Sequence, residues 1–174
     1  MYLVIAGTNR RESVTLSIAR YYHEQLLDKG LHSHLLPLEN LPLDFLFPEM
    51  YDQSNGPLGE MQEELLIPSQ KFIFVFPEYN GSFPGVLKAF IDACDVERCF
   101  HHKKAALLGV SAGRGGNLRG MDHLTGILHH LKISVIPDPL PISSIFKLFD
   151  HEGHLDNEEA IKRINHQIDA FRDF

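Results

Sequence analysis

The sequence contains no tryptophan and only two cysteines, Cys94 and Cys99, in 174 residues. Five residues apart on one predicted helix, the two thiols are expected to point to different faces, so we predict no disulfide. No apolar run is long enough for a membrane span, and residues 1–7 lack the charged leader of a signal peptide. We therefore expect a cytoplasmic protein that has no membrane partner.

Positive charge is also scarce, because 16 lysines and arginines stand against 23 aspartates and glutamates, for a formal net charge of −7. This balance gives no electrostatic reason to expect nucleic acid or an anionic membrane as a partner. The length suits one domain with a substantial core, and we find no repeat, low-complexity tract or linker. The prediction is a single domain over residues 1–174.

Short apolar runs alternate with stretches of helical periodicity along the chain. The runs predict five strands, at 2–6, 34–38, 71–76, 105–110 and 133–136. The helical stretches begin near Val14 (with a stop at Gly30), Leu58, Leu87, Met121 and Ile161, the last preceded by Asp156 and Glu159 at the spacing of a capping box. Strands that alternate with helices predict an α/β fold whose parallel sheet has helices on both faces. Right-handed crossovers at this length favour the flavodoxin-like doubly wound order 2-1-3-4-5.

The most specific motif follows the third predicted strand. Residues 77–82 read Pro-Glu-Tyr-Asn-Gly-Ser, and the chain continues as Phe-Pro-Gly-Val-Leu-Lys into a helix. Ligands of open parallel sheets bind where strands end in such loops, and Gly81 has no Cβ to hold a flat ring at a distance. The alternative is a tight turn selected for its geometry alone. The stretch closely resembles the PEYNGS signature of the NAD(P)H-dependent FMN reductases, a flavodoxin-like family.

The loop after the first strand carries hydroxyls and arginines beside a helix N-terminus. Residues 7–15 read Gly-Thr-Asn-Arg-Arg-Glu-Ser-Val-Thr, which is neither a Walker P-loop nor a dinucleotide fingerprint. A helix N-terminus attracts phosphate, and arginine adds charge-assisted hydrogen bonds. From the residues alone, a capped turn with Ser13 as N-cap is an equal alternative. The family resemblance favours phosphate binding, although Thr15 stands where the family usually has asparagine.

A third loop, residues 111–119, follows the fourth strand as Ser-Ala-Gly-Arg-Gly-Gly-Asn-Leu-Arg. Its glycines allow backbone to approach a planar ligand, its arginines could meet a nicotinamide phosphate, and its start resembles the family's S-x-G-x-x-G-G pattern. The segment 109–113 also fits G-x-S-x-G, the nucleophile elbow of serine hydrolases, and Asp138, Asp150, His151 and His154 follow in triad order. We treat hydrolysis as a remote alternative, because further glycines separate Ser111 from the next helix.

Two other features have an ordinary explanation. The eleven histidines lack the spacing of a metal site, so we expect none. Phe45, Phe47, Met50 and Tyr51 form an apolar loop, which either packs on its own domain or covers a partner subunit's flavin or makes a subunit contact.

The resemblance implies an NAD(P)H-dependent, FMN-binding oxidoreductase. It implies ping-pong hydride transfer from NADPH or NADH to FMN and on to a small acceptor such as a flavin, quinone or azo compound. It also implies a homodimer or homotetramer. The expected FMN-binding residues are Thr8, Arg10, Ser13, Thr15, Pro77, Glu78, Tyr79, Asn80, Gly81, Ser111 and Gly113. No side chain is expected to act as a catalytic nucleophile. A flavodoxin-like electron carrier without nicotinamide turnover is the alternative function.

Overall fold

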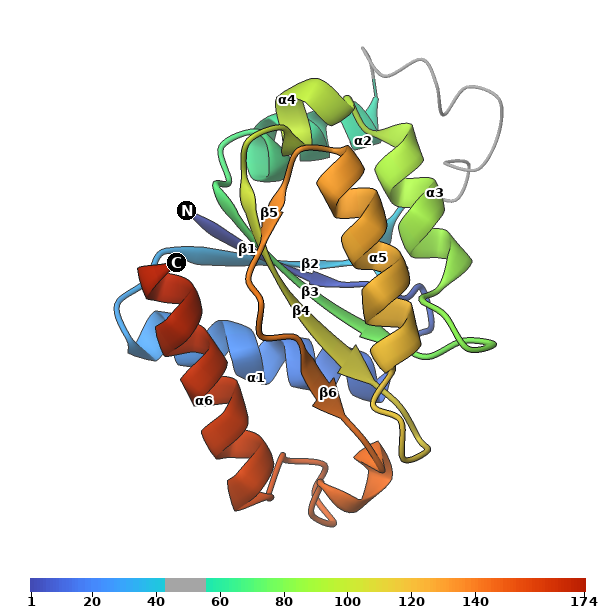
Figure 1. Ribbon diagram of the computed structural model, residues 1–174, viewed down its shortest axis with the longest axis vertical. Coiled ribbons are helices and arrows are strands. Elements are labelled where there is room, and N and C mark those ends of the chain that lie inside the picture. The colour runs from blue at the N-terminus through green and yellow to red at the C-terminus, as the bar shows by residue number, and fades with distance from the viewer. Residues whose placement is uncertain (43–55) are drawn as a thin grey trace.

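The computed structural model describes residues 1–42 and 56–174, which form a parallel sheet between two layers of helices (Figure 1). The sheet has the order β2-β1-β3-β4-β5, which confirms the flavodoxin-like prediction. Its main strands are β1 (Tyr2–Ala6), β2 (Ser33–Pro37), β3 (Lys71–Pro77) and β4 (Lys104–Val110). All pair in parallel, so their carboxyl ends meet at one edge.

The predicted fifth strand, 133–136, is wrong in extent, because the edge strand is divided in two. β5 (Ser134–Val135) and β6 (Leu140–Ile142) both pair with β4, and Pro137 and Pro139 lie between them. Proline has no N–H for the sheet ladder, so pairing stops there. The Gln167 side chain bridges the gap, since its Nε2 donates to the carbonyls of Leu107, at 3.1 Å, and Asp138, at 2.9 Å.

Two apolar cores lie on opposite faces of the sheet. Helices α1 (Val14–Asp28) and α6 (Glu158–Asp173) cover one face, and α3 (Gly85–Ala93) and α5 (Leu118–His130) cover the other (Figure 1). Alternate strand residues supply the two cores: Leu3 and Ile5 face α3 and α5, whereas Val4 and Ala6 face α1. The strands are apolar throughout because both faces are buried.

Shorter elements complete the described chain. These are η1 (Leu38–Asn40), α2 (Pro57–Met61), the π-helical turn η3 (Gln62–Leu66), α4 (Val96–Phe100) and η4 (Ile145–Lys147). The helix predicted from Leu58 is thus divided between α2 and η3, and α4 was not predicted. None of the described helices has the length and apolar character that a membrane crossing requires. The apolar loop that contains Phe45 and Tyr51 lies outside the described residues.

The helix ends follow local capping chemistry. The Ser13 hydroxyl accepts the amide of Leu16 at 3.1 Å, as expected of an N-cap. Gly30, at φ +73°, ends α1 as predicted, in a Schellman arrangement. The capping box predicted at Asp156 is wrong: Asn157 is the N-cap of α6, and its Oδ1 accepts the amide of Ala160.

The two cysteines are buried free thiols, as predicted, but the predicted reason is wrong. The chain turns between α3 and α4, so Cys94 and Cys99 do not share a helix. Their thiols lie close enough to interact: a hydrogen bond with Cys99, together with burial, raises the pKa of Cys94 well above its usual value. A thiol in this state is a poor nucleophile.

Candidate functional site

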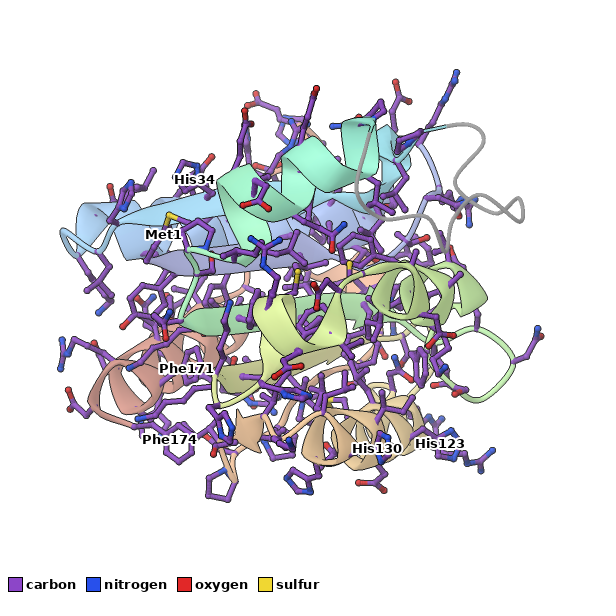
Figure 2. All side chains as sticks on the ribbon, turned by 90° about the horizontal axis from the view of Figure 1, so that it is seen from above. Met1, His34, His123, His130, Phe171 and Phe174 are labelled. Atoms are coloured by element: carbon purple, nitrogen blue, oxygen red, sulfur yellow. The ribbon has the colours of Figure 1, made fainter. Side chains whose placement is uncertain are left out.

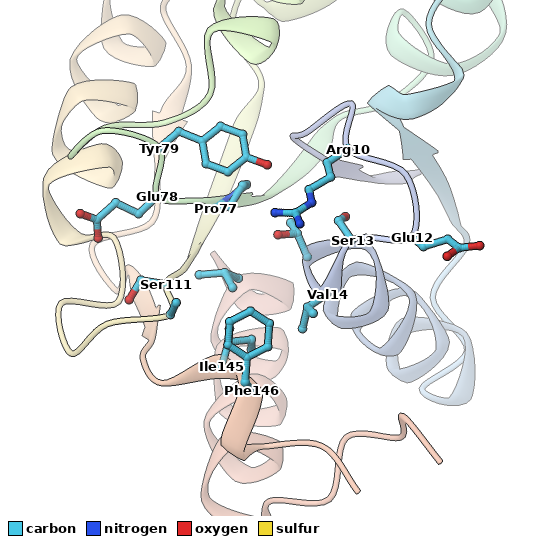
Figure 3. A pocket seen from close by; sticks show the side chains of 13 residues that line it. Arg10, Glu12, Ser13, Val14, Pro77, Glu78, Tyr79, Ser111, Ile145 and Phe146 are labelled. Carbon is cyan, nitrogen blue, oxygen red and sulfur yellow. The ribbon is translucent and has the colours of Figure 1, made fainter. Parts of the chain in front are cut away.

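A cavity of about 280 Å³ opens at the carboxyl ends of β1, β3 and β4 (Figure 3). The three glycine-containing loops of the sequence meet there, as the parallel sheet requires. Seven predicted site residues line the cavity: Arg10, Ser13, Thr15, Pro77, Glu78, Tyr79 and Ser111. Glu12, Val14, Val110, Ala112, Ile145 and Phe146 complete its walls.

Thr8, Asn80, Gly81 and Gly113, the other predicted residues, do not line the cavity. Asn80 and Gly81 have φ values of +53° and +77°, and Tyr79 and Ser82 exchange both main-chain hydrogen bonds around them. These are the features of a two-residue hairpin turn of type I′, for which Asn-Gly is the favoured pair. A Cβ on Gly81 would lie 2.9 Å from the Arg119 guanidinium, the end of a flexible side chain, so the positive φ of the turn is the main reason for glycine here.

Thr8 connects the loop after β1 with the loop after β3 through a hydrogen bond to Tyr79. It is buried, and its Oγ1 lies 3.0 Å from the Tyr79 hydroxyl and 3.3 Å from the amide of Arg10, which donates to it. Thr8 therefore fixes two residues that do line the cavity. The orientation of the Tyr79 ring thus depends on the first loop.

One wall of the cavity is suited to an anion. Arg10 is exposed and points into the cavity beside Ser13, at the start of α1 (Figure 3). No hydrogen bond or ion pair joins its guanidinium to another described residue. The carboxylates of Glu12 and Glu78 point away from it (Figure 3). Amides in the first turn of a helix have no intrahelical acceptor, so the end of α1 adds partial positive charge.

The opposite wall is apolar, and sequence reasoning missed it. Ile145 and Phe146 reach the cavity because Ile145 N donates to Ser111 O at 3.1 Å, and Ser144 N donates to Gly113 O at 2.8 Å. Phe146 is 70% exposed, the largest exposed fraction among the large apolar side chains of the described residues. The missed signal was the apolar segment 140–142 after the two prolines, which continues the edge strand to the cavity.

The arrangement around Ser111 argues against the hydrolase alternative. The Ser111 hydroxyl donates to Gly113 O at 3.0 Å and accepts from Gly116 N at 2.9 Å. No described histidine is bonded to it, and α5 begins only at Leu118. A nucleophile elbow needs an activating base and an immediate strand-to-helix turn. Ser111 instead orders its own loop.

The charged residues of the predicted triad and the histidines form no enclosed site in the described chain. Asp150, Glu152 and His154 lie near one another on an exposed loop. The Asp150 carboxylate accepts the amides of Glu152 and His154, and these bonds lower its pKa. This geometry is that of a side chain that closes its own turn.

Comparison with known proteins agrees with this geometry. The family model for NADPH-dependent FMN reductase matches residues 2–147. An NAD(P)H-dependent FMN reductase of Pseudomonas aeruginosa is 33% identical over 150 residues, which cover 84% of this chain and 80% of that protein. An FMN-dependent NADH:quinone oxidoreductase of Geobacillus kaustophilus is 46% identical over 129 residues, covering 68% of this chain and 61% of that protein.

Solved structures show the same fold. The flavoenzyme NAD(P)H:(acceptor) oxidoreductase FerB of Paracoccus denitrificans superposes with a TM-score of 0.79 at 22% sequence identity, over 99% of this chain and 94% of that one. The order of the strands, the loops at their carboxyl ends and the sequence comparisons therefore lead to one assignment. The chain belongs to the NADPH-dependent FMN reductase family of flavodoxin-like NAD(P)H oxidoreductases.

Proposed function

We propose that FMN binds in the cavity with its phosphate between Arg10 and the N-terminus of α1. The main support for this proposal is that the Arg10 guanidinium points into the cavity and forms no hydrogen bond or ion pair with another described residue. Ser13 and Thr15 add hydroxyls at the same end. A phosphate there would meet both the helix dipole and a charge-assisted hydrogen bond.

The rest of the cavity fits a flat, partly polar ring system. Pro77, Glu78, Tyr79 and Ser111 would border the ring, and Phe146 would supply an apolar face. Asn80, Gly81 and Gly113 would support these residues through the backbone, and Thr8 would do so through its bond to Tyr79. Thr15 would offer the phosphate a hydroxyl in the position where the family usually has an amide.

Bound FMN would supply the redox chemistry, as the two-electron acceptor from NAD(P)H and donor to a small acceptor. The chain's residues would bind and orient the reactants. Because the Ser111 hydroxyl is held by its own loop, it would not act as a nucleophile. The same open cavity would admit the nicotinamide and then the acceptor in turn, as ping-pong kinetics require, and Arg114 and Arg119 would attract the dinucleotide phosphates.

The acceptors proposed for this chain are quinones, azo compounds and free flavins. Two features of the surface favour a homodimer or homotetramer: Tyr79 is 36% exposed and Phe146 is 70% exposed, both at the cavity. A second subunit that covers them would also exclude water from the reaction. Light scattering of the purified protein tests the assembly. We further propose a single domain in a reducing cytoplasm, where Cys94 and Cys99 stay free.

The decisive experiment is the visible spectrum of the purified protein, followed by anaerobic addition of NADPH and of NADH. We expect a flavin spectrum that is bleached by a nicotinamide and restored by a quinone. A flavin spectrum that neither nicotinamide bleaches would instead favour the electron carrier. A colourless protein that does not quench the fluorescence of added FMN would contradict FMN binding altogether.

A further inference from the structure

Asn117 is a buried polar residue that the proposed mechanism does not use. Its exposed fraction is 0%, and it does not line the cavity. It stands at the N-cap of α5 in the left-handed conformation, at φ +62°, yet its side chain makes no capping hydrogen bond. Instead, Nδ2 donates to the carbonyl of Phe76 at 3.2 Å. Phe76 immediately precedes Pro77, the first residue of the loop that borders the cavity.

Gly109 and Gly120 make room for the Asn117 side chain, because neither has a side chain of its own. A Cβ on Gly120 would lie 2.1 Å from Asn117 Oδ1 and 2.9 Å from the amide nitrogen of Phe83. A Cβ on Gly109 would lie 3.0 Å from the Asn117 Cβ. Neither glycine could carry a side chain without displacing its neighbours. The Gly120 backbone therefore packs closely on both Asn117 and the amide of Phe83, whereas Asn117 itself bonds to Phe76, directly before the loop 77–82.

We propose that Asn117 is a positioning residue that holds the first end of the loop 77–82 to the start of α5. Pro77, Glu78 and Tyr79 line the cavity from this loop, so its position sets the width of the cavity. The consequence for FMN rests on the proposed function, whereas the effect on the loop does not. A loop fixed before the ligand arrives loses less conformational entropy on binding.

The energetic cost of keeping Asn117 supports this role. Its Oδ1 has no hydrogen-bond partner among the described residues, and an unsatisfied buried oxygen is destabilising. Glycine would adopt the left-handed conformation more easily. The amide is thus poorly explained as a helix cap, and its bond to Phe76 is the interaction that glycine could not provide.

Gln167 offers a matched control. It is also a buried amide, 1% exposed, whose Nε2 donates to main-chain carbonyls and whose Oε1 has no partner among the described residues. It lies on α6, bonds across the gap in the divided edge strand and does not line the cavity. A purely structural role for Asn117 predicts that Asn117→Gly and Gln167→Ala behave alike.

The test is hydrogen exchange of the full-length protein, with and without FMN, together with FMN affinity. The informative amides are those of Glu78, Tyr79 and Ser82, which donate to Val110 O, Ser82 O and Tyr79 O. We expect Asn117→Gly to speed their exchange about tenfold without FMN, and to weaken FMN binding about three- to tenfold, which is the effect of one hydrogen bond. Gln167→Ala should lower the melting temperature and leave both quantities at wild-type values.

Equal hydrogen-exchange rates of these loop amides in Asn117→Gly and Gln167→Ala would overturn the proposal. If Asn117→Gly does not fold, Asn117→Ser is measured against the same expectations, since serine is too short to reach Phe76. Should the wild type not bind FMN at all, the proposed function fails, but loop exchange in the free protein still decides the role of Asn117.

Discussion

The two ends of the sheet differ in how their cations are held. At the amino ends of the strands, three lysines donate to carbonyls at the C-terminal ends of helices. At the carboxyl ends, the loop arginines form no hydrogen bond or ion pair with another described residue. Lys103 bonds to Leu66 O and Ile67 O, and Lys71 bonds to Phe171 O and Arg172 O. Lys104 likewise donates to Phe174 O. Figure 2 shows Phe171 and Phe174 at the opposite end of the molecule from His123, which bonds to Ser82 beside the cavity.

The helix dipole explains the difference between the two ends. Cations at helix C-termini are stabilising, so the lysines at the amino end contribute to the fold. Arg10, Arg114 and Arg119 stand near the N-termini of α1 and α5, where the dipole adds positive charge to positive charge. That arrangement costs stability unless an anion binds near the arginines. At the amino end the lysine charges have partners within the described chain, whereas at the carboxyl end we propose that a bound anion supplies the partner.

Among the substitutions that test this contrast, Lys103→Met is expected to change the free energy of unfolding most. Lys103 is 6% exposed, and the substitution would remove the charge-assisted hydrogen bonds that Leu66 O and Ile67 O accept from it. We expect a loss of about 2–4 kcal/mol in the free energy of unfolding, with FMN affinity unchanged. Denaturant unfolding and FMN fluorescence quenching measure the two. A variant that is fully stable would show that the amino end does not depend on its lysines.

The pH dependence of the free energy of unfolding, compared between wild type and Lys103→Met, tests the same lysine further. Burial lowers the pKa of Lys103 below its usual 10.5. The folded state therefore releases the lysine proton at a lower pH than the unfolded state does, and the wild type gains stability as the pH rises through the folded pKa toward the unfolded one. The stability difference between wild type and Lys103→Met should grow over that alkaline range. A difference that shrinks would mean that the folded protein prefers the charged lysine.

At the carboxyl end, Arg10→Ala should do the reverse. We expect FMN binding to weaken by about 1–3 kcal/mol, the scale of a charge-assisted hydrogen bond, and stability without FMN to stay the same or rise slightly. Riboflavin, which has no phosphate, is the control ligand and should lose far less affinity. Equal losses for both ligands would show that Arg10 supports the loop and does not contact the phosphate.

The smallest effect is expected from Ser111→Ala. The Ser111 hydroxyl, which the substitution removes, bonds only to its own loop, at Gly113 and Gly116, and a single hydrogen bond is worth about 0.5–1.5 kcal/mol. NAD(P)H oxidation with excess FMN should therefore stay within about tenfold of wild type. A catalytic serine would cost on the order of a millionfold. Ester cleavage by the wild type that is lost in the variant, with no nicotinamide oxidation in either, would reverse the functional assignment.

Much of the carboxyl end could be predicted from the sequence because its signals are local. Five apolar runs and the stretches between them specify a parallel sheet, which brings loops after β1, β3 and β4 to one edge whatever their side chains. The N-cap at Ser13 and the stop at Gly30 likewise depend only on neighbouring residues. The motif at 77–82 was recognisable without any contact being known.

Contacts between distant segments were decided only by the tertiary structure. Ile145 and Phe146 reach the cavity because two prolines divide the edge strand and Ser111 then holds the segment that follows. The partners of Lys103 and Asn117 are carbonyls 36 to 41 residues away, and no periodicity signals such a bond. A hydrophobic pattern specifies which face of an element is buried, but a single polar atom finds its partner only when the packed elements bring the two together.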